Sequence, residues 1–108
     1  MTWIIDYYND GVLDDIRALP TDLKARYARL TNLMIDNGTN IGSNKTKHIL
    51  NGLFELRLRG KSGIARVMFC TVINNKIVML SCFTKKTQKT PQREINKAIT
   101  RMKEVKTR

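Results

Sequence analysis

The residues best suited to chemistry in this sequence are basic, and they fall in its second half. They are Arg57, Arg59, Lys61, Arg66, Lys85, Lys86 and Lys89. Guanidinium groups bind phosphate oxygens through paired hydrogen bonds and stabilise the extra negative charge of a phosphoryl-transfer transition state. The set therefore suits cleavage of a phosphodiester by the neighbouring ribose 2′-OH, a reaction that requires RNA.

Arg66 is the most informative of these residues because it interrupts an otherwise apolar segment, residues 64–70. A charge in such a segment costs stability unless it faces solvent or an anion. Two interpretations follow. Arg66 binds an anion, or it is a charge on an edge strand that discourages aggregation. We favour anion binding.

Attack by a 2′-OH also needs a general base. The chain has one histidine, His48, which excludes a two-histidine ribonuclease site, and we expect His48 to be a solvated loop residue. Lys85 and Lys86 lie among other cations, which lower the pKa of a lysine, so either one is a candidate base. Phe83 precedes this pair and could stack on an RNA base, although an aromatic at a strand end is more often part of the core.

Metal and nucleotide cofactors are not expected. Catalytic metals need clusters of His, Cys, Asp or Glu, and the chain has only three acidic residues after position 44. The Gly-Lys-Ser-Gly sequence at residues 60–63 lacks the spacing of a Walker phosphate-binding loop, so we expect a hairpin turn there. Cys70 and Cys82 have neither metal-site nor disulfide-scaffold spacing, and we expect them to be reduced packing residues.

Composition indicates one small cationic domain over residues 1–108. Of these residues 42% are hydrophobic, the formal net charge is +11 and the pI is about 10.1. Residues 1–44 hold four Lys/Arg and six Asp/Glu, whereas residues 45–108 hold sixteen and three. Positive charge concentrated in this way indicates a binding surface for a polyanion. Because the sequence shows neither a long apolar run nor a signal peptide, we expect a cytoplasmic protein without a membrane contact.

Hydrophobic periodicity and turn residues predict the elements that position the cations. We expect a strand at residues 2–8, helices at 11–19 and 21–37, a polar loop at 37–47, strands at 53–59, 64–73 and 76–83, and a last helix. We expect Asn74-Asn75 to form a two-residue hairpin turn between the last two strands, and Thr90-Pro91 to start the last helix, with Thr90 as its N-cap. The order β-α-α-β-β-β-α predicts an α+β fold, with an N-terminal helical hairpin, a mainly antiparallel sheet and a C-terminal helix. In such a meander Arg57 and Arg66 lie on neighbouring strands.

Three stretches resemble motifs of the RelE/ParE toxin superfamily, in its phage-derived, Gp49-like HigB branch. They are Gly52-Leu-Phe-Glu-Leu-Arg57, Gly63-Ile-Ala-Arg-Val67 and Phe83-Thr-Lys-Lys-Thr-Gln-Lys-Thr-Pro91. The first resembles the family's G-L-[YFW]-E-L-R and the third its F-x-K-K-T-x-x-T-P. With the helical hairpin and the closing helix, the resemblance covers nearly the whole chain and implies a RelE-like fold.

The resemblance implies the toxin of a type II toxin–antitoxin system, a ribosome-dependent mRNA endonuclease that works without metal. It also implies a hetero-oligomer with a cognate antitoxin, which we expect to be HigA-like with a helix-turn-helix. Arg57 and Arg66 match the family's phosphate-binding arginines, and Lys85 and Lys86 match its basic pair after the last strand. We therefore expect these four to be catalytic. The RNA-binding residues that we expect are Arg59, Lys61, Phe83 and Lys89.

Two alternatives remain open at this point. The ParE branch of the superfamily poisons DNA gyrase without cutting RNA, and a basic module of this size could also bind RNA without catalysis. A shared fold does not separate these functions.

Overall fold

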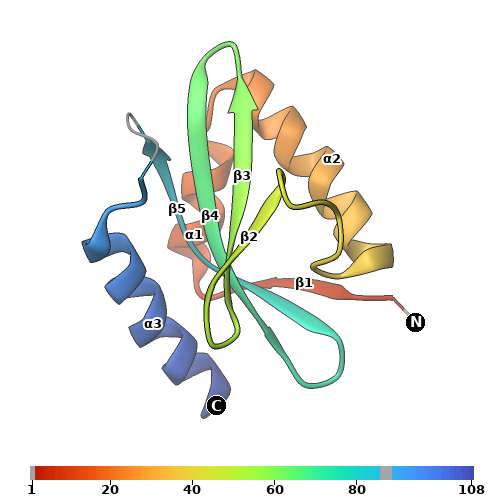
Figure 1. Cartoon of the computed structure of the whole chain (residues 1–108), viewed down its shortest axis with the longest axis vertical. Coiled ribbons are helices and arrows are strands. Elements are labelled where there is room, and N and C mark those ends of the chain that lie inside the picture. Colours follow the sequence, from red (N-terminus) through yellow and green to blue (C-terminus); the bar gives the residue numbers. More distant parts are fainter. Residues whose placement is uncertain (1, 86–88) are drawn as a thin grey trace.

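The computed structural model describes residues 2–85 and 89–108, without the side chain of Lys85. A five-stranded sheet carries two helices on one face and a third helix on the other (Figure 1). The elements are β1 (Ile4–Tyr7), α1 (Asp10–Arg17), α2 (Thr21–Asn37), β2 (Thr46–Leu50), β3 (Leu53–Gly60), β4 (Gly63–Val72), β5 (Lys76–Lys85) and α3 (Gln92–Lys106). The α+β fold is confirmed. In the part of the chain that is described, no helix has the length and apolar character needed to cross a bilayer.

Strand β2 was not predicted, because we expected a polar loop at residues 37–47 and no strand between that loop and residue 53. It pairs with β3 in antiparallel register, with an irregularity between His48 and Leu50. It lies at the edge of the sheet, and Lys47 and His48 are exposed. An edge strand of this kind is held by the backbone groups of its neighbour more than by its own apolar pattern. The added strand borders the part of β3 that carries Arg57.

The strand order β1-β5-β4-β3-β2 places the predicted cations in the middle of the sheet. Strand β1 runs parallel to β5, and all other neighbouring strands are antiparallel. In this register Arg57 of β3 lies opposite Arg66 of β4, and Arg66 lies opposite Phe83 of β5. The meander therefore brings three of the predicted site residues into one row.

Two turns set this register. Asn74 and Asn75 have φ values of 66° and 54°, the left-handed conformations that a two-residue hairpin turn requires, as predicted. Residues 60–63 form the turn between β3 and β4. The carboxylate of Asp22 in α2 accepts hydrogen bonds from the backbone N–H and the hydroxyl of Ser62, at 2.9 and 2.6 Å. This turn is therefore anchored to α2.

The sheet separates two apolar clusters. On one face Leu23 and Leu30 of α2 pack in a cluster with Leu56 of β3, together with residues of α1. On the other face Ala98 and Met102 of α3 pack against one end of the sheet. Phe83, at one end of the row that contains Arg57, packs against this second cluster, whereas Arg57 and Arg66 are not part of it.

Cys70 and Cys82 are free and lie in different clusters on opposite faces of the sheet. Burial raises the pKa of the Cys70 thiol and raises that of Cys82 to about 12. Both thiols are therefore protonated at neutral pH and pack as small apolar groups, as expected from their spacing.

We expect Asp22→Ala to lower the free energy of unfolding at pH 7, because it removes the anchor of the β3–β4 turn. The hydrogen bonds from Ser62 lower the pKa of Asp22. Their stabilisation is therefore complete above the ordinary carboxyl pKa of about 3.9 and disappears as the pH falls through the lower pKa of the folded chain. Urea titrations of both proteins over this pH range measure the difference. A difference that stays constant into acid would contradict the prediction.

Candidate functional site

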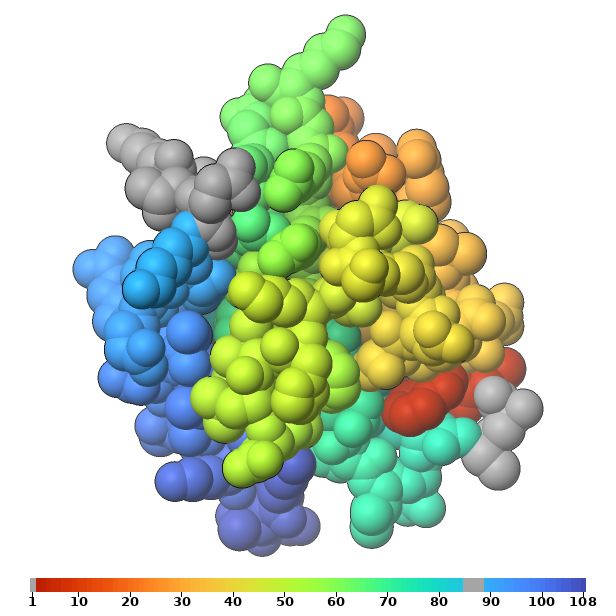
Figure 2. Space-filling view, viewed as in Figure 1, coloured from red at the N-terminus to blue at the C-terminus, as the bar shows by residue number. Residues whose placement is uncertain are grey.

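The charged residues of β3 project from the sheet on the same face as α3. Glu55 and Arg57 alternate with Leu56 and Leu58, which are buried under the helices on the opposite face. In Figure 2, β3 and β4 are visible at the surface. On one side of them lie β2 and the loop before β2, and on the other side lies the beginning of α3. The charged row thus lies between an edge strand and a helix N-terminus.

A buried ion pair forms the centre of this row. The Nε atom of Arg66 lies 3.0 Å from Oε1 of Glu55, and their side chains are only 1% and 2% exposed. The Nε atom of Arg57 lies 3.9 Å from the same carboxylate oxygen, and the Arg57 side chain is 24% exposed. One carboxylate therefore offsets part of the repulsion between two guanidinium groups on neighbouring strands.

Thr90 connects this ion pair to the segment before α3. Its hydroxyl donates to Oε2 of Glu55 at 2.5 Å. We expected Thr90 to be the N-cap of the last helix, which was wrong, because the helix begins at Gln92 and its N-cap is Pro91 without a side-chain cap bond. A buried carboxylate needs donors for its lone pairs, and Thr90 supplies one of them.

Arg66 is a buried cation, and two of its nitrogen atoms have no hydrogen-bond partner among the described residues. Burial lowers the pKa of its guanidinium, the carboxylate of Glu55 raises it, and the charges of Arg57 and Arg59 lower it. The group nevertheless stays charged, as arginine does in proteins. Although Nε of Arg66 is close to Glu55, it does not have hydrogen-bond geometry, and Nη1 has no hydrogen-bond partner among the described residues. Unsatisfied cationic donors favour a further anion nearby.

A cavity of about 220 Å³ opens beside the ion pair. Its lining comes from β2, β3 and the start of α3, and consists of Lys47, His48, Ile49, Glu55, Arg57, Lys89, Thr90 and Ile95. His48 is exposed, as expected, but it belongs to β2 and not to a loop. Its ring lies edge-on to Phe54, with 5.2 Å between the ring centroids. Lys47 and Lys89 therefore line the same cavity as Glu55 and Arg57.

The structure brings several of the predicted residues together. Arg57, Arg66 and Phe83 share one row, Arg59 is exposed two residues further along β3, Lys61 is exposed in the β3–β4 turn, and Lys89 lines the cavity. The backbone of Lys85 pairs with Ile64, at the same end of the sheet. Lys86 lies outside the described residues. Phe83 is half-buried and packs against the α3 cluster, which is the core interpretation of this residue.

Glu55, Thr90 and Lys47 belong to the site and were missed as site residues. Alternation along β3 indicated only that Glu55 is on the polar side of the strand. Its burial depends on Arg66 from β4 and Thr90 from the start of α3, and these contacts are distant in sequence. Lys47 was assigned to a loop because β2 was not predicted.

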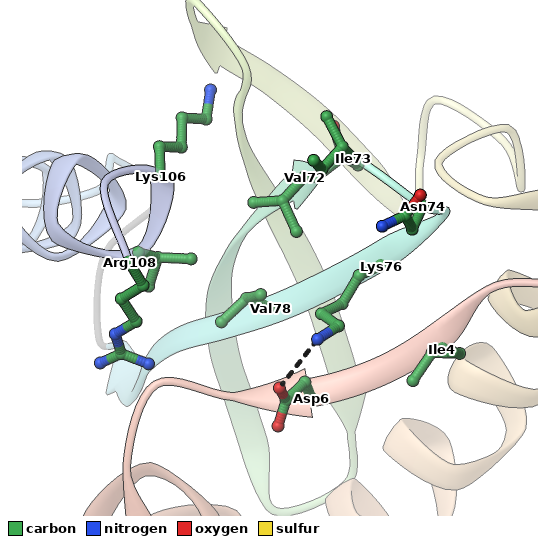
Figure 3. A pocket seen from close by; sticks show the side chains of 11 residues that line it. Ile4, Asp6, Val72, Ile73, Asn74, Lys76, Val78, Lys106 and Arg108 are labelled. Atoms are coloured by element: carbon green, nitrogen blue, oxygen red, sulfur yellow. Dashed lines mark ion pairs between the residues drawn. The ribbon is translucent and has the colours of Figure 1, made fainter.

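A larger cavity, of about 770 Å³, lies between β1, the β4–β5 hairpin and the end of α3 (Figure 3). Its walls include Val72, Val78 and Ile73, and Ile73 is 84% exposed. Asp6 and Lys76 form an ion pair of 3.9 Å at its side. Lys106 and Arg108 also line it, but in Figure 3 their side chains point in different directions. No two arginines meet there around one carboxylate as Arg57 and Arg66 do, so we assign the chemistry to the row at Arg57. The described residues contain no group of three or more His, Cys, Asp or Glu that could hold a metal.

A protein-family comparison identifies the group to which this architecture belongs. Residues 14–103 match the model described as "Phage derived protein Gp49-like (DUF891)". The chain belongs to this family. All three motifs named above lie inside the matched region, and the resemblance to the Gp49-like family is confirmed. No curated protein matches the sequence significantly.

The fold of this Gp49-like chain is similar to a chain in the crystal structure of the archaeal RelE–RelB complex from Pyrococcus horikoshii OT3. The TM-score is 0.55 with 16% sequence identity, over 80% of this chain and 98% of that chain. At this identity the likeness concerns the fold, and it confirms the RelE-like arrangement expected from the sequence.

We expect Arg66→Met to reduce the free energy of unfolding by about 3–5 kcal/mol, because it leaves the Glu55 carboxylate buried without its closest cation. The double variant Arg66→Met/Glu55→Leu removes both charges and should recover most of this loss. Urea unfolding of the three proteins measures both effects. If the double variant is no more stable than the single one, the ion pair is not what makes Arg66 necessary for stability.

Proposed function

We propose that this chain is the toxin of a type II toxin–antitoxin pair and that it cleaves mRNA on the ribosome. The observation that carries the proposal is the placement of Arg57 opposite Arg66, around one carboxylate, with a cavity beside them. Membership of the Gp49-like family and the RelE-like fold support it. A net charge of +11 favours a polyanionic target.

The proposed reaction is attack of a ribose 2′-OH on the adjacent phosphorus. The 2′-oxygen–phosphorus bond forms while the bond from phosphorus to the 5′-oxygen breaks, so the products carry a 2′,3′-cyclic phosphate and a 5′-hydroxyl. Arg57 is partly exposed, and we assign its guanidinium to the non-bridging oxygens of the scissile phosphate. It would stabilise the charge that builds up in the transition state.

Arg66 takes part from β4, the strand next to the one that carries Arg57. Because its side chain is only 1% exposed, an RNA phosphate reaches it only when neighbouring side chains shift. Its Nη1 donor has no hydrogen-bond partner among the described residues and is positioned by the ion pair with Glu55. We therefore assign Arg66 two tasks, to hold the charged row in place and to donate to the phosphate once RNA is bound.

The proton of the 2′-OH needs a base, and the departing 5′-oxygen needs an acid. Lys85 and Lys86 remain our candidates. In support, the backbone of β5 brings Lys85 opposite Ile64, two residues from Arg66 on β4. For RNA binding we propose Arg59 and Lys61, which are exposed beyond Arg57, with Lys89 at the cavity and the ring edge of Phe83.

We propose an antitoxin as the partner that restrains this activity in a hetero-oligomer, and specifically a HigA-like protein. The matched solved structure is itself a complex of RelE with RelB. A chain with a net charge of +11 binds cellular RNA broadly unless it is masked, and an acidic partner segment would mask it.

We expect Arg57→Ala to reduce the rate of message cleavage by about 10²–10³-fold, as loss of one transition-state donor typically does. Arg57→Lys should recover only part of it, because an ammonium does not make the paired contact of a guanidinium. Cleavage of a defined message in a purified translation system measures both variants. Lys103→Ala, an exposed position on α3, is the control and should cut at the wild-type rate.

Cleavage by Arg57→Ala at the wild-type rate would contradict the role assigned to Arg57.

Expression of the chain in bacteria tests the proposed function as a whole. Growth arrest with intact messages and DNA breaks would indicate the ParE-like alternative, a gyrase poison, and RNA binding without cleavage would indicate a non-catalytic module.

A further inference from the structure

A second basic cavity lies on the other side of Arg57. It has a volume of about 190 Å³ and is lined by Arg26 and Leu30 of α2, Asn44 and Lys45 before β2, and Arg57 and Arg59 of β3. Four of these residues are cations, and the lining contains no acidic residue. Pockets for drug-sized ligands have volumes of roughly 300–1,000 Å³, so this cavity suits a smaller anionic group.

Backbone contacts hold the cations around this cavity. The N–H of Arg57 donates to the carbonyl oxygen of Lys45 at 2.8 Å, which fixes the loop before β2 against β3. The Nε–H of Arg26 donates to the carbonyl oxygen of Arg59 at 3.4 Å, which directs the Arg26 side chain from α2 toward β3. The fold itself therefore brings these like charges together.

The charges around the cavity are poorly compensated within the chain. The Nε atom of Arg57 lies 3.9 Å from the carboxylate of Glu55, which lines the other cavity. Arg26, Lys45 and Arg59 form no ion pair with any described residue. Like charges at short range repel one another, and an anion from outside relieves this repulsion.

We propose that this cavity binds the phosphate next to the scissile phosphate in a single strand of RNA. The inference rests on the proposed function and extends its substrate site. Arg57 lines both cavities, so a strand that crosses Arg57 places successive phosphates on its two sides. Figure 2 shows the loop before β2 directly beside β3 at the surface of the molecule.

The subsite contacts the RNA backbone, so it adds affinity without reading the base sequence. It also gives a role to Arg26, which lies in the part of the chain where acidic residues outnumber basic ones. The distribution of charge along the chain does not indicate that Arg26 belongs to a binding site, because α2 contacts β3 only in the folded chain.

The test is the double variant Arg26→Gln/Lys45→Gln, which removes two charges and keeps both arginines of β3. The probe is a single-stranded 2′-O-methyl RNA oligonucleotide, which binds but cannot be cut, and anisotropy is measured over a range of salt concentrations. We expect binding to weaken by at least roughly 100-fold, from two lost charge-assisted contacts. The slope of log affinity against log salt should fall by about 1.4 in magnitude, from about 0.7 for each charge on a single strand.

Lys97→Gln/Lys103→Gln is the matched control, because it removes the same charge from exposed positions on α3. It should weaken binding much less. Lys45→Gln alone should give about half the change in the slope. It preserves the backbone hydrogen bond between Lys45 and Arg57, so this single variant replaces the double variant if the double variant does not fold. Equal losses in the α3 control and the double variant would overturn the proposal, since they would show a general charge effect.

A second outcome would also overturn it. If the double variant keeps its RNA affinity but loses its binding to an acidic antitoxin segment, the cavity belongs to the partner and not to RNA. Since the probe cannot be cleaved, the result is separate from the proposed nuclease activity. Loss of probe binding in the double variant supports the subsite even if the wild-type chain cleaves no message.

Discussion

The buried pair of Glu55 and Arg66 is the interaction on which the rest of the site depends. Arg66 sits in the interior of a strand, where an uncompensated guanidinium would be very costly. Glu55 compensates it from β3 and also accepts the hydroxyl of Thr90, so one carboxylate joins two strands to the segment before α3. Arg57, Arg59 and Arg66 are consequently presented by the sheet, which holds side chains more precisely than a loop does.

The same carboxylate explains how a strongly basic surface coexists with a stable fold. Glu55 offsets only part of the positive charge around it, since Arg57 and Arg66 share one oxygen and Arg59 lies further along the strand. What remains is a net positive row beside two small cavities. Repulsion within this row costs stability, while an RNA strand supplies the missing countercharge, so folding and binding make opposite demands on these residues.

Much of this organisation could be predicted from local patterns. The predicted meander placed Arg57 and Arg66 on neighbouring strands, and the Asn74-Asn75 turn predicted the β4–β5 pairing. The motifs also identified the family. Three features could not be predicted, because they depend on contacts between distant segments. Strand β2 is held mainly by its neighbour, Thr90 binds a carboxylate instead of capping its helix, and the anion that faces Arg66 comes from within the chain.

The central claim is that the ribose 2′-OH, assisted by a row of arginines, attacks the phosphate, and that a metal-bound water does not. The chemical nature of the ends of a message cut by the purified chain in a translation system tests it most directly. Attack by the 2′-OH leaves a 2′,3′-cyclic phosphate and a 5′-hydroxyl, and the account predicts these ends. A 3′-hydroxyl paired with a 5′-phosphate, as water attack at a metal centre can produce, would contradict it.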